Sequence, residues 1–242
     1  MESFGTVDGP GIRLVIFCQG CPLRCLYCHN PDTWETHGGQ LISPEELIAQ
    51  FEKNRPFYQK GGITVTGGEP LLQVDFLIDL FRLARERGIH TCIDTSGGTF
   101  VPHKANEKLD QLMALTDLVM LDIKHMDEGA HRKLTGMDNQ RVFAFARYLD
   151  QKGVPLRIRH VVVPTITDSR EQLTALGQFM GTLSNVIGLE VLPYHTMGVN
   201  KYKELGMEYP LKDLSSATNQ QAEDAQKIIL SAFYVTRQKV KQ

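Results

Sequence analysis

The chain has 242 residues, of which 42% are apolar and 22% charged, and its formal net charge is −2. This composition is typical of a globular protein with one large or two small domains, and the near-neutral charge argues against nucleic-acid binding. No apolar run approaches the ~20 residues that span a bilayer, so we expect no membrane segment. The first residues lack the basic and apolar regions of a signal peptide, which favours a cytoplasmic, reducing location. Without coiled-coil heptads, we expect a monomer.

Apolar strand-like runs alternate with helical patterns along the chain. Strands are predicted at 12–17, 63–66, 91–94, 118–123, 156–163 and 187–192. Helices are predicted at about 44–53, 74–87, 104–115, 139–151, 169–183 and 220–233. This alternation is typical of parallel βαβ units, and six such strands suit a doubly wound sheet or an incomplete barrel. Because no linker divides the chain, residues 1–242 are predicted to form one domain.

Three cysteines lie close together in residues 18–30, the loop that follows the first predicted strand. Cys21, Cys25 and Cys28 form the pattern Cys-x3-Cys-x2-Cys, and thiolates this close can hold an iron–sulfur cluster. Only three are offered, so one iron of a four-iron cluster would stay open to a small molecule, as an open position does in catalytic metal sites. Cys18 and Cys92 lie in apolar runs, where free cysteine behaves as a small buried residue.

Three other interpretations of the cysteine pattern are open. Zinc could bind the three thiolates with His29, although zinc sites usually divide their ligands into two separated pairs. The run from Cys25 to His29 also matches the haem-attachment pattern Cys-x-x-Cys-His, which would imply an exported protein and leave Cys21 unexplained. A disulfide framework suits short secreted chains better than one of this length.

Polar and glycine-containing motifs follow or close most of the predicted strands, and one, Arg159-His160, lies within the fifth. Active sites of these architectures lie at the carboxyl ends of the strands. The motifs are Gly67-Gly68-Glu69-Pro70, Asp94-Thr95-Ser96-Gly97, Asp122-Ile123-Lys124, Arg159-His160 and Pro193-Tyr194-His195. Glycine lets a ligand approach the backbone, and two side chains spaced by two on a strand share one face. Each motif also has a simpler explanation: a turn, a buried ion pair or an ordinary histidine. Their convergence on one rim favours a site.

The cysteine motif, with Tyr27 before its last cysteine, resembles the radical S-adenosylmethionine (radical SAM) superfamily. Gly67-Gly68-Glu69-Pro70 resembles the motif of that superfamily that binds the amino group of the cofactor. Residues 5–13, together with Tyr27-Cys28-His29-Asn30, resemble the glycyl-radical-enzyme activating enzymes. Residues 117–124 and 192–195 are similar to the branch of these enzymes that acts on pyruvate formate-lyase.

The resemblance implies an α/β fold, an incomplete (β/α)6 barrel of parallel strands, and a definite chemistry. The three cysteines would bind a [4Fe–4S] cluster whose fourth iron is chelated by S-adenosylmethionine. An electron from a flavodoxin or ferredoxin would allow cleavage of the sulfonium to a 5′-deoxyadenosyl radical. That radical would remove a hydrogen atom from a glycine of pyruvate formate-lyase. The cofactor carries the difficult chemistry, and the protein orients it.

The resemblance also implies roles for single residues around the cofactor. Tyr27, Cys28 and His29 would border the adenosine and the cluster. Gly68 would contact the methionine amino group, with Gly67 and Glu69 shaping the loop. Asp122, Ile123 and Lys124 would line the pocket, Lys124 pairing with the cofactor carboxylate, and His195 would reach it from the last strand.

Two further sites are implied, one for a cation and one for the partner. Sodium or potassium would be held at four positions, Asp94, Thr95, Met120 and Asp122, since such a hard cation prefers oxygen ligands. The loop Asp8-Gly9-Pro10-Gly11 would lie near the open end and meet the partner protein through Asp8. Its residue types would equally suit a simple turn.

Two rival functions remain open. The chain could activate another glycyl-radical enzyme, although many such activators carry an inserted ferredoxin-like segment with extra cysteines, which this sequence lacks. The activator of the anaerobic ribonucleotide reductase is usually shorter. A rival of a different class is a non-catalytic protein that binds zinc through the cysteine loop.

Overall fold

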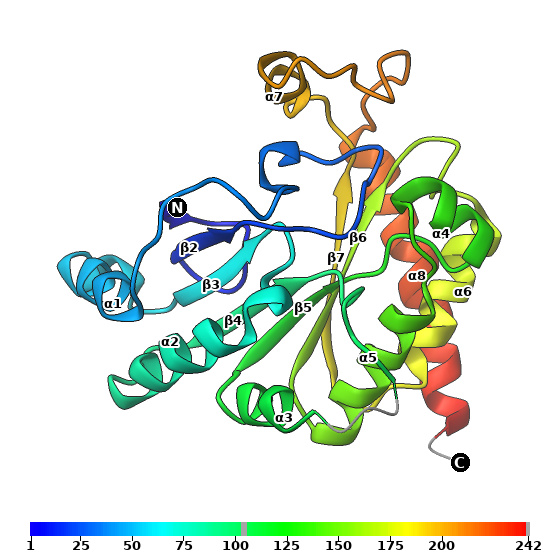
Figure 1. The fold of residues 1–242 in the computed structure, drawn as a ribbon. Helices are drawn as coiled ribbons and strands as arrows, with labels where there is room; N and C mark the ends of the chain where they lie inside the picture. The colour runs from blue at the N-terminus through cyan, green and yellow to red at the C-terminus, as the bar shows by residue number, and fades with distance from the viewer. Residues whose placement is uncertain (103–105, 241–242) are drawn as a thin grey trace.

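The computed structural model describes residues 1–102 and 106–240, and its strands form one open, curved sheet (Figure 1). The described strands pair in sequence order: β1 Glu2–Gly5, β2 Arg13–Cys18, β3 Gly62–Gly67, β4 Thr91–Thr95, β5 Leu118–Asp122, β6 Leu156–Val162 and β7 Val186–Pro193. β2 to β7 are parallel, whereas β1 runs antiparallel to β2. β1 and β7 lie at opposite edges of this order. The predicted α/β class and incomplete barrel of six parallel strands are therefore confirmed.

Most helices lie between successive strands along the chain and pack on the outside of the sheet, whereas the last two follow β7 (Figure 1). In the described chain they are α1 Pro44–Lys53, α2 Val74–Glu86, α3 Glu107–Ala114, α4 Glu128–Thr135, α5 Gln140–Lys152, α6 Arg170–Gly181, α7 Val199–Glu204 and α8 Asn219–Val240. Short 3-10 turns occur at η1 Pro31–Thr33, η2 Arg55–Tyr58 and η3 Pro70–Gln73. The predicted start of the third helix, residue 104, lies outside the described residues. None of the helices described is long and apolar enough to cross a membrane.

Alternate residues of each strand face opposite sides of the curved sheet, as strand geometry requires. In β5, Val119 and Leu121 pack in the hydrophobic core with the helices. Met120 lies in a separate buried cluster with Cys92, and Asp122 lines a cavity on the inner side. The inner side of the strands is therefore free to carry polar groups, whereas the outer side is apolar and holds the fold together.

The structure contains elements that the sequence pattern did not predict. β1 has only four residues and an irregular register with β2, so no periodic signal marks it. α4 and α7 are short and mostly polar outside their buried contacts. The last helix, predicted at about 220–233, extends to Val240 in the structure. The prediction stopped short because the exposed final turns have no apolar periodicity.

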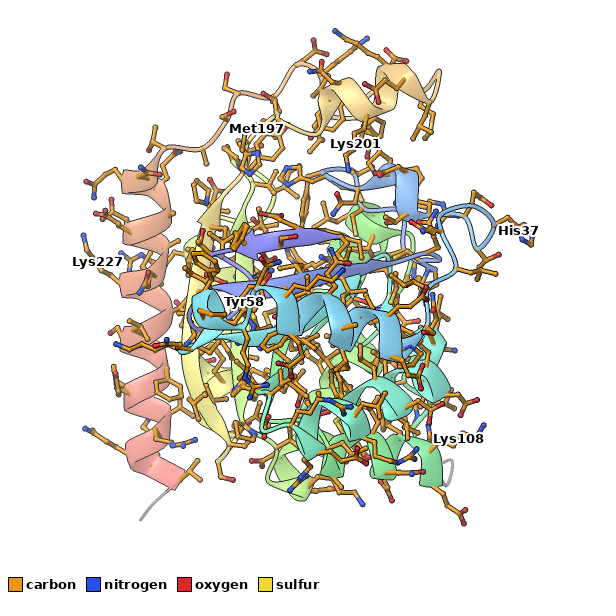
Figure 2. All side chains as sticks on the ribbon, turned by 90° about the vertical axis from the view of Figure 1, so that its left-hand side faces the viewer. His37, Tyr58, Lys108, Met197, Lys201 and Lys227 are labelled. Carbon is orange, nitrogen blue, oxygen red and sulfur yellow. The ribbon has the colours of Figure 1, made fainter. Side chains whose placement is uncertain are left out.

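The C-terminal helix α8 packs closely on α6 and also contacts β7 (Figure 1). A Cβ added at Gly177 would lie 2.2 Å from the carbonyl oxygen of Ile229, and one at Gly181 would lie 2.6 Å from Thr236 Cβ. The two glycines therefore allow a separation of the two helices that any side chain would prevent. Figure 2 shows the exposed face of α8, where Lys227 points to solvent.

Candidate active site

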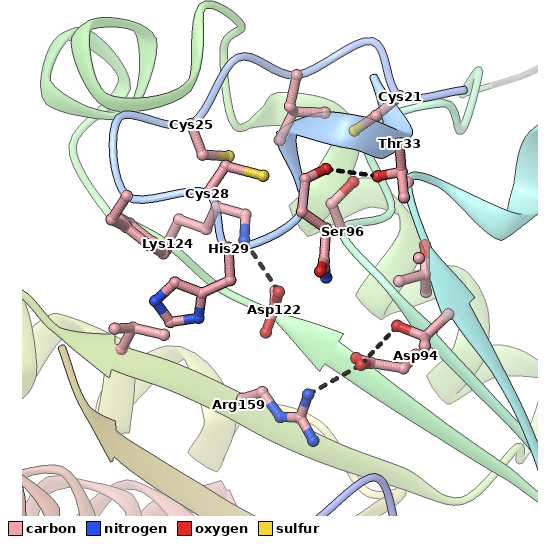
Figure 3. Close-up of a pocket in the computed structure, with 18 of the residues that line it drawn as sticks. Cys21, Cys25, Cys28, His29, Thr33, Asp94, Ser96, Asp122, Lys124 and Arg159 are labelled. Carbon is pink, nitrogen blue, oxygen red and sulfur yellow. Dashed lines mark hydrogen bonds and ion pairs between the residues drawn. The ribbon is translucent and has the colours of Figure 1, made fainter. Parts of the chain in front are cut away.

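A cavity of about 290 Å³ opens at the carboxyl ends of the parallel strands (Figure 3). It brings together most of the site residues predicted from the sequence: Asp8, Cys21, Cys25, Tyr27, Cys28, His29, Gly67, Gly68, Asp94, Thr95, Asp122, Lys124 and His195. Trp34, Ser96 and Arg159 also line it. Its size is near the lower end of the range for small-molecule sites, roughly 300–1,000 Å³.

The cysteine loop is fixed by backbone hydrogen bonds to the end of α4. The amide of Arg24 donates to the carbonyl of Thr135 at 2.7 Å, and that of Leu26 donates to Leu134 at 2.9 Å. Within the loop, the amide of Cys28 donates to the carbonyl of Cys25 at 3.0 Å. Helix α4, which the sequence pattern did not predict, therefore fixes the cysteine loop through its last two carbonyl groups.

The thiols of this loop are protonated in the metal-free protein. Burial raises the pKa of Cys21 to about 11 and that of Cys25 to about 12. Burial also raises the pKa of Cys28, but hydrogen bonds from the Asn30 backbone and the Trp34 side chain oppose the increase. In the described residues, no three His, Cys, Asp or Glu side chains converge tightly enough to hold a single metal ion.

The donor chemistry nevertheless fits an iron–sulfur cluster with a polar ligand beside it. Three thiols of one short loop line one cavity, and thiolates are the usual ligands of such clusters. In the same cavity, Asp122 Oδ1 and His195 Nδ1 are buried without a hydrogen-bond partner in the described chain. Buried polar atoms normally have partners, so these two indicate a place for a ligand with its own polar groups.

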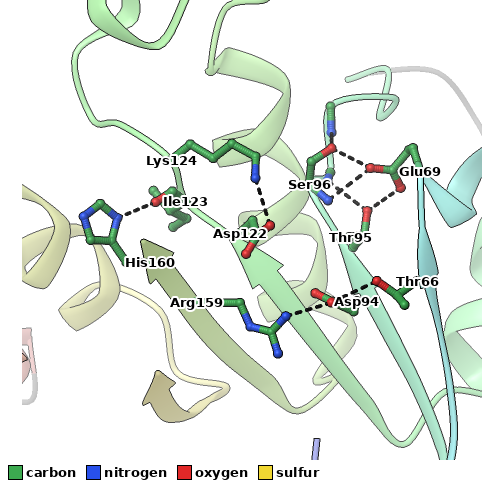
Figure 4. A network of polar contacts seen from close by, with 12 residues as sticks. Thr66, Glu69, Asp94, Thr95, Ser96, Asp122, Ile123, Lys124, Arg159 and His160 are labelled. Carbon is green, nitrogen blue, oxygen red and sulfur yellow. Dashed lines mark hydrogen bonds and ion pairs between the residues drawn. The ribbon is translucent and has the colours of Figure 1, made fainter. Parts of the chain in front are cut away.

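Asp122 and Lys124 form an ion pair at the end of β5 (Figure 4). Lys124 Nζ lies 2.9 Å from Asp122 Oδ2 and 5.5 Å from the centre of the Tyr27 ring. Burial alone would lower the pKa of Lys124, but the Asp122 carboxylate raises it well above its usual value. Lys124 is therefore a fixed positive charge in the cavity, available to a second carboxylate.

Arg159 of β6 joins the cavity floor to three other parts of the chain; the sequence pattern placed it among the motifs of the rim but gave it no specific role. Its guanidinium contacts Asp94 Oδ2 at 2.8 Å (Figure 4). It also contacts Glu190 Oε2 at 2.9 Å. It also donates to the carbonyl of Val7 at 2.9 Å. A charged residue within a strand of alternating burial was the available signal.

Glu69, Ile123 and Met120, also predicted as site residues, are not among the residues that line the described cavity. The fully buried Glu69 carboxylate accepts hydrogen bonds from Thr95 Oγ1, from the amide and hydroxyl of Ser96, and from the amide of Leu71. The Ile123 side chain packs in the core, and its carbonyl accepts from His160 Nδ1 at 2.7 Å. Met120 is fully buried beneath Arg159, its Sδ 3.9 Å from Nη2.

Gly67 and Gly68 are required by close packing against the start of the cysteine loop. Gly67 has φ +112°, and a Cβ there would lie 2.4 Å from the amide nitrogen of Cys18. A Cβ at Gly68 would lie 2.2 Å from the carbonyl oxygen of Gly20. The amide of Gly68 donates to the Cys18 carbonyl at 2.9 Å. The two motifs thus form one packed unit.

The segment after β7 covers the cysteine loop from the solvent side. The rings of His29 and His195 stack with centroids 4.1 Å apart, and His29 Nε2 donates to the carbonyl of His195 at 3.0 Å. Burial lowers the pKa of both imidazoles, so both are neutral near pH 7. Lys201 of α7 bonds Asn30 Oδ1 and Asp32 Oδ1, each at 2.9 Å. Figure 2 shows Met197 and Lys201 at this end of the molecule.

Asp8 lines the same cavity from the loop between β1 and β2. Burial raises the pKa of its carboxyl above the usual value, and the charge of Arg159 opposes the increase. Its carbonyl accepts a hydrogen bond from Thr64 Oγ1 at 2.6 Å, and Gly9 adopts φ +119°, where only glycine is unstrained. The loop is therefore fixed, with the Asp8 side chain directed to the cavity.

Comparison with known proteins agrees with this geometry. Residues 15–176 match the family model of the radical SAM superfamily. A pyruvate formate-lyase-activating enzyme of Listeria monocytogenes is 48% identical, over 97% of this chain and 96% of its own length. The corresponding enzyme of Staphylococcus epidermidis is 46% identical, over 95% and 93%. The chain therefore belongs to the radical SAM superfamily and, within it, to the family of the pyruvate formate-lyase-activating enzymes.

Solved structures of lower identity share the fold. Streptococcus suis SuiB bound to S-adenosylmethionine superposes with a TM-score of 0.65 and 21% identity, over 90% of this chain and 48% of that one. A domain of a pyruvate formate-lyase-activating enzyme from Bacteroides vulgatus superposes with a TM-score of 0.57 and 22% identity, over 71% of this chain and 94% of that one. Both likenesses support the open barrel of parallel strands.

Proposed function

We propose that this protein activates pyruvate formate-lyase by removing a hydrogen atom from a glycine of the lyase, which leaves a glycyl radical. The observation that carries the proposal is the meeting of three cysteines and the Asp122–Lys124 pair in one cavity. The relatives of nearly equal length that share almost half of the residues are named for this activity. When bound, a [4Fe–4S] cluster and S-adenosylmethionine supply the reductive cleavage that starts the reaction.

The chain's own residues bind and orient these groups in the proposed function. Cys21, Cys25 and Cys28 ligate the cluster. Lys124 pairs with the carboxylate of S-adenosylmethionine, because its charge is fixed by Asp122 and faces the cavity. The backbone at Gly67 and Gly68 receives the amino group. The remaining residues border the adenosine or support the pocket: Tyr27, His29, Glu69, Ile123 and His195.

A monovalent cation, sodium or potassium, completes the proposed site at Asp94, Thr95, Met120 and Asp122. Asp122 Oδ1, buried and without a partner in the described part of the chain, is the observation that supports it. Asp94 Oδ2 already accepts from Arg159 and Thr66, so the other carboxylate oxygen would contribute. Full activity after exhaustive removal of sodium and potassium would contradict this site, and a loss restored by one of them would support it.

The partners follow from the same family. We infer that a flavodoxin or ferredoxin supplies the electron, that the protein acts in the cytoplasm as a monomer, and that residues 1–242 work as one domain. Asp8 contacts the lyase in this proposal, because its side chain lines the cavity and its loop is held in place by Thr64 and Arg159.

The decisive experiment is anaerobic reconstitution followed by electron paramagnetic resonance. The wild-type protein should bind about four irons and four sulfides per chain. After reduction with S-adenosylmethionine and pyruvate formate-lyase, it should give a glycyl-radical signal. The matched controls are a Cys28→Ala protein and a lyase whose radical glycine is changed to alanine. A signal only with another glycyl-radical enzyme would change the partner, and a colourless zinc protein would refute the proposal.

A further inference from the structure

Arg13, the first residue of β2, is a fully buried charge on the inner side of the sheet. Its hydrogen bonds go to neutral groups, namely the hydroxyl of Thr64 and the backbone carbonyls of Pro10, Ile63 and His90. Within residues 1–102 and 106–240 it forms no ion pair with a carboxylate. A guanidinium stays charged in proteins, and burying a charge is costly unless it is well bonded. Hydrogen bonds to neutral groups therefore hold this charge inside the protein.

Two of these bonds lead to the loop between β1 and β2, which carries Asp8. Arg13 Nη1 donates to the carbonyl of Pro10 at 3.0 Å. Arg13 Nε donates to Thr64 Oγ1 at 2.6 Å, and this hydroxyl donates in turn to the carbonyl of Asp8 at 2.6 Å. Arg13 thus fixes two carbonyls of the loop, one directly and one through the hydroxyl of Thr64.

The Thr64 hydroxyl has its direction set by Arg13. A guanidinium can only donate hydrogen bonds, so the hydroxyl has to accept from it. The single proton of the hydroxyl is then left for the carbonyl of Asp8. A bond from a charged donor is stronger than one between neutral groups, and it polarises the next bond of the chain. The fully buried Thr64 is therefore a directed link between the charge and the loop.

The Asp8 loop also fits closely against the interior of the sheet. A Cβ at Gly9 would lie 3.1 Å from Arg13 Cδ, and Gly9 has φ +119°. Arg159 donates to the carbonyl of Val7 at 2.9 Å. These hydrogen bonds are all to backbone carbonyls of the loop, so they fix its path and leave the Asp8 side chain to line the cavity.

We propose that Arg13 and Thr64 are positioning residues for the hydrogen-atom transfer: through the loop carbonyls they set the Asp8 carboxylate for its contact with the lyase. The inference rests on the proposed function, in which Asp8 meets the lyase. Neither Arg13 nor Thr64 lines the cavity in the described structure. Their effect is therefore on the use of the lyase, and the binding of the cluster and of S-adenosylmethionine is independent of them.

The first test is Thr64→Val, which keeps the shape of the side chain and removes the hydroxyl between Arg13 and Asp8. Glycyl radical formation is measured at increasing concentrations of pyruvate formate-lyase. The value of kcat/KM for the lyase should fall roughly tenfold, the scale expected for the loss of one or two hydrogen bonds. Iron content and the affinity for S-adenosylmethionine should equal those of the wild type. Thr64→Ser keeps the hydroxyl and should keep kcat/KM.

Thr91→Val is the matched control for the loss of a buried hydroxyl. Thr91 is buried on the neighbouring strand β4, where its hydroxyl donates to the carbonyl of Leu115 at 2.8 Å and accepts from the amide of Asp117 at 3.1 Å. It therefore loses bonds of the same kind away from the Asp8 loop, and kcat/KM for the lyase should not change. An equal loss in the two valine variants would overturn the inference.

The second test asks whether Thr64 acts through Asp8. Asp8→Ala alone should lower kcat/KM for the lyase, and Thr64→Val added to it should cause little further loss, because residues that act as a unit are not additive. If Thr64→Val does not fold, as judged by circular dichroism, Arg13→Lys takes its place. Lysine keeps the charge but lacks the planar fork that bonds Thr64 and Pro10 together, so the same selective loss is expected.

The outcomes separate this inference from the proposed function. A selective loss that serine prevents and that disappears without the Asp8 carboxylate supports the positioning role. Wild-type kcat/KM in a folded Thr64→Val, Arg13→Lys or Asp8→Ala protein overturns it, as does a loss that adds in full to that of Asp8→Ala, while the hydrogen-atom transfer itself stands. A wild-type protein that forms no glycyl radical on pyruvate formate-lyase refutes the proposed function and this inference with it.

Discussion

The carboxylate of Asp94 and the guanidinium of Arg159 form an ion pair of 2.8 Å between β4 and β6. Both side chains are close to nine-tenths buried, with exposed fractions of 9% and 11%. The same guanidinium contacts Glu190 of β7, so one cation balances two carboxylates on separate strands. The floor of the cavity therefore depends on this arginine for its charge balance and for the spacing of its strands.

Arg159→Gln should strongly destabilise the protein. It leaves Asp94 buried and Glu190 partly buried without their cation, and breaking a buried pair by removing one partner costs about 3–5 kcal/mol. Urea denaturation of the metal-free protein measures the loss. The control is Lys108→Gln, whose pair with Asp75 is mostly exposed and should be worth less than about 1 kcal/mol. Equal losses in the two variants would contradict the role of Arg159.

Iron content should separate the five cysteines into two groups. Alanine at Cys21, Cys25 or Cys28 removes a thiolate from the cavity, so reconstitution should yield little stable cluster. Cys18 and Cys92 are buried in strands and do not line the cavity, and alanine at either should leave the iron content unchanged. Iron and sulfide analysis of all five variants is the measurement. Loss of iron in Cys18→Ala alone would mean that the ligand set has been misassigned.

The metal-free protein should lose stability as the pH rises above 9. The pKa of a free thiol is 9.0, whereas burial raises that of Cys21 to about 11 and that of Cys25 to about 12. Between these values the unfolded chain has released protons that the folded chain retains. The unfolded state then binds fewer protons, so the free energy of unfolding falls with rising pH.

Urea denaturation at pH 8 and pH 10, under reducing and metal-free conditions, tests this dependence. Other groups titrate in the same range, so the comparison is with the double variant Cys21→Ser, Cys25→Ser. Its stability should decline less steeply over the interval. An identical decline in the two proteins would show that the buried thiols do not contribute.

Gly198 should not tolerate a side chain. A Cβ at this position would lie 2.9 Å from His29 Cα and 3.3 Å from the carbonyl oxygen of Cys28. Both are backbone atoms, which can move little to make room for a side chain. Gly198→Ala should therefore cost about 1–3 kcal/mol, as overpacking does. Gly129→Ala is the matched substitution. Its Cβ would meet only the Asp127 carboxylate at 3.4 Å, and in helix α4 it should stabilise by up to about 1 kcal/mol. Thermal unfolding of both variants should show opposite signs.

The six parallel strands were predictable because buried strands and amphipathic helices carry local signals. Ser43 and Glu46 form the capping box that their spacing implies at the start of α1. The position of the site was predictable for a topological reason: parallel strands end at one rim, and the motifs follow the strands. Most of the residues predicted to form the site do line the cavity.

Other features could not be predicted, because they depend on contacts between residues far apart in the sequence. The ion pair of Arg159 with Asp94 spans 65 positions of the sequence. The sequence around each of these two residues gives no indication of its partner. The inward turn of Glu69 toward Thr95 and Ser96 follows from the packing of β3 on β4. The hold of α7 on the cysteine loop depends on the path of the chain after β7.

The contacts between the cysteine loop and the residues around α7 span 166 to 171 positions of sequence. During synthesis the three cysteines leave the ribosome long before His195 and Lys201, the residues that cover them in the folded protein. The cover from the segment after β7 can therefore form only after residue 201 has been made. A cluster bound under that cover has to be loaded after this point of synthesis.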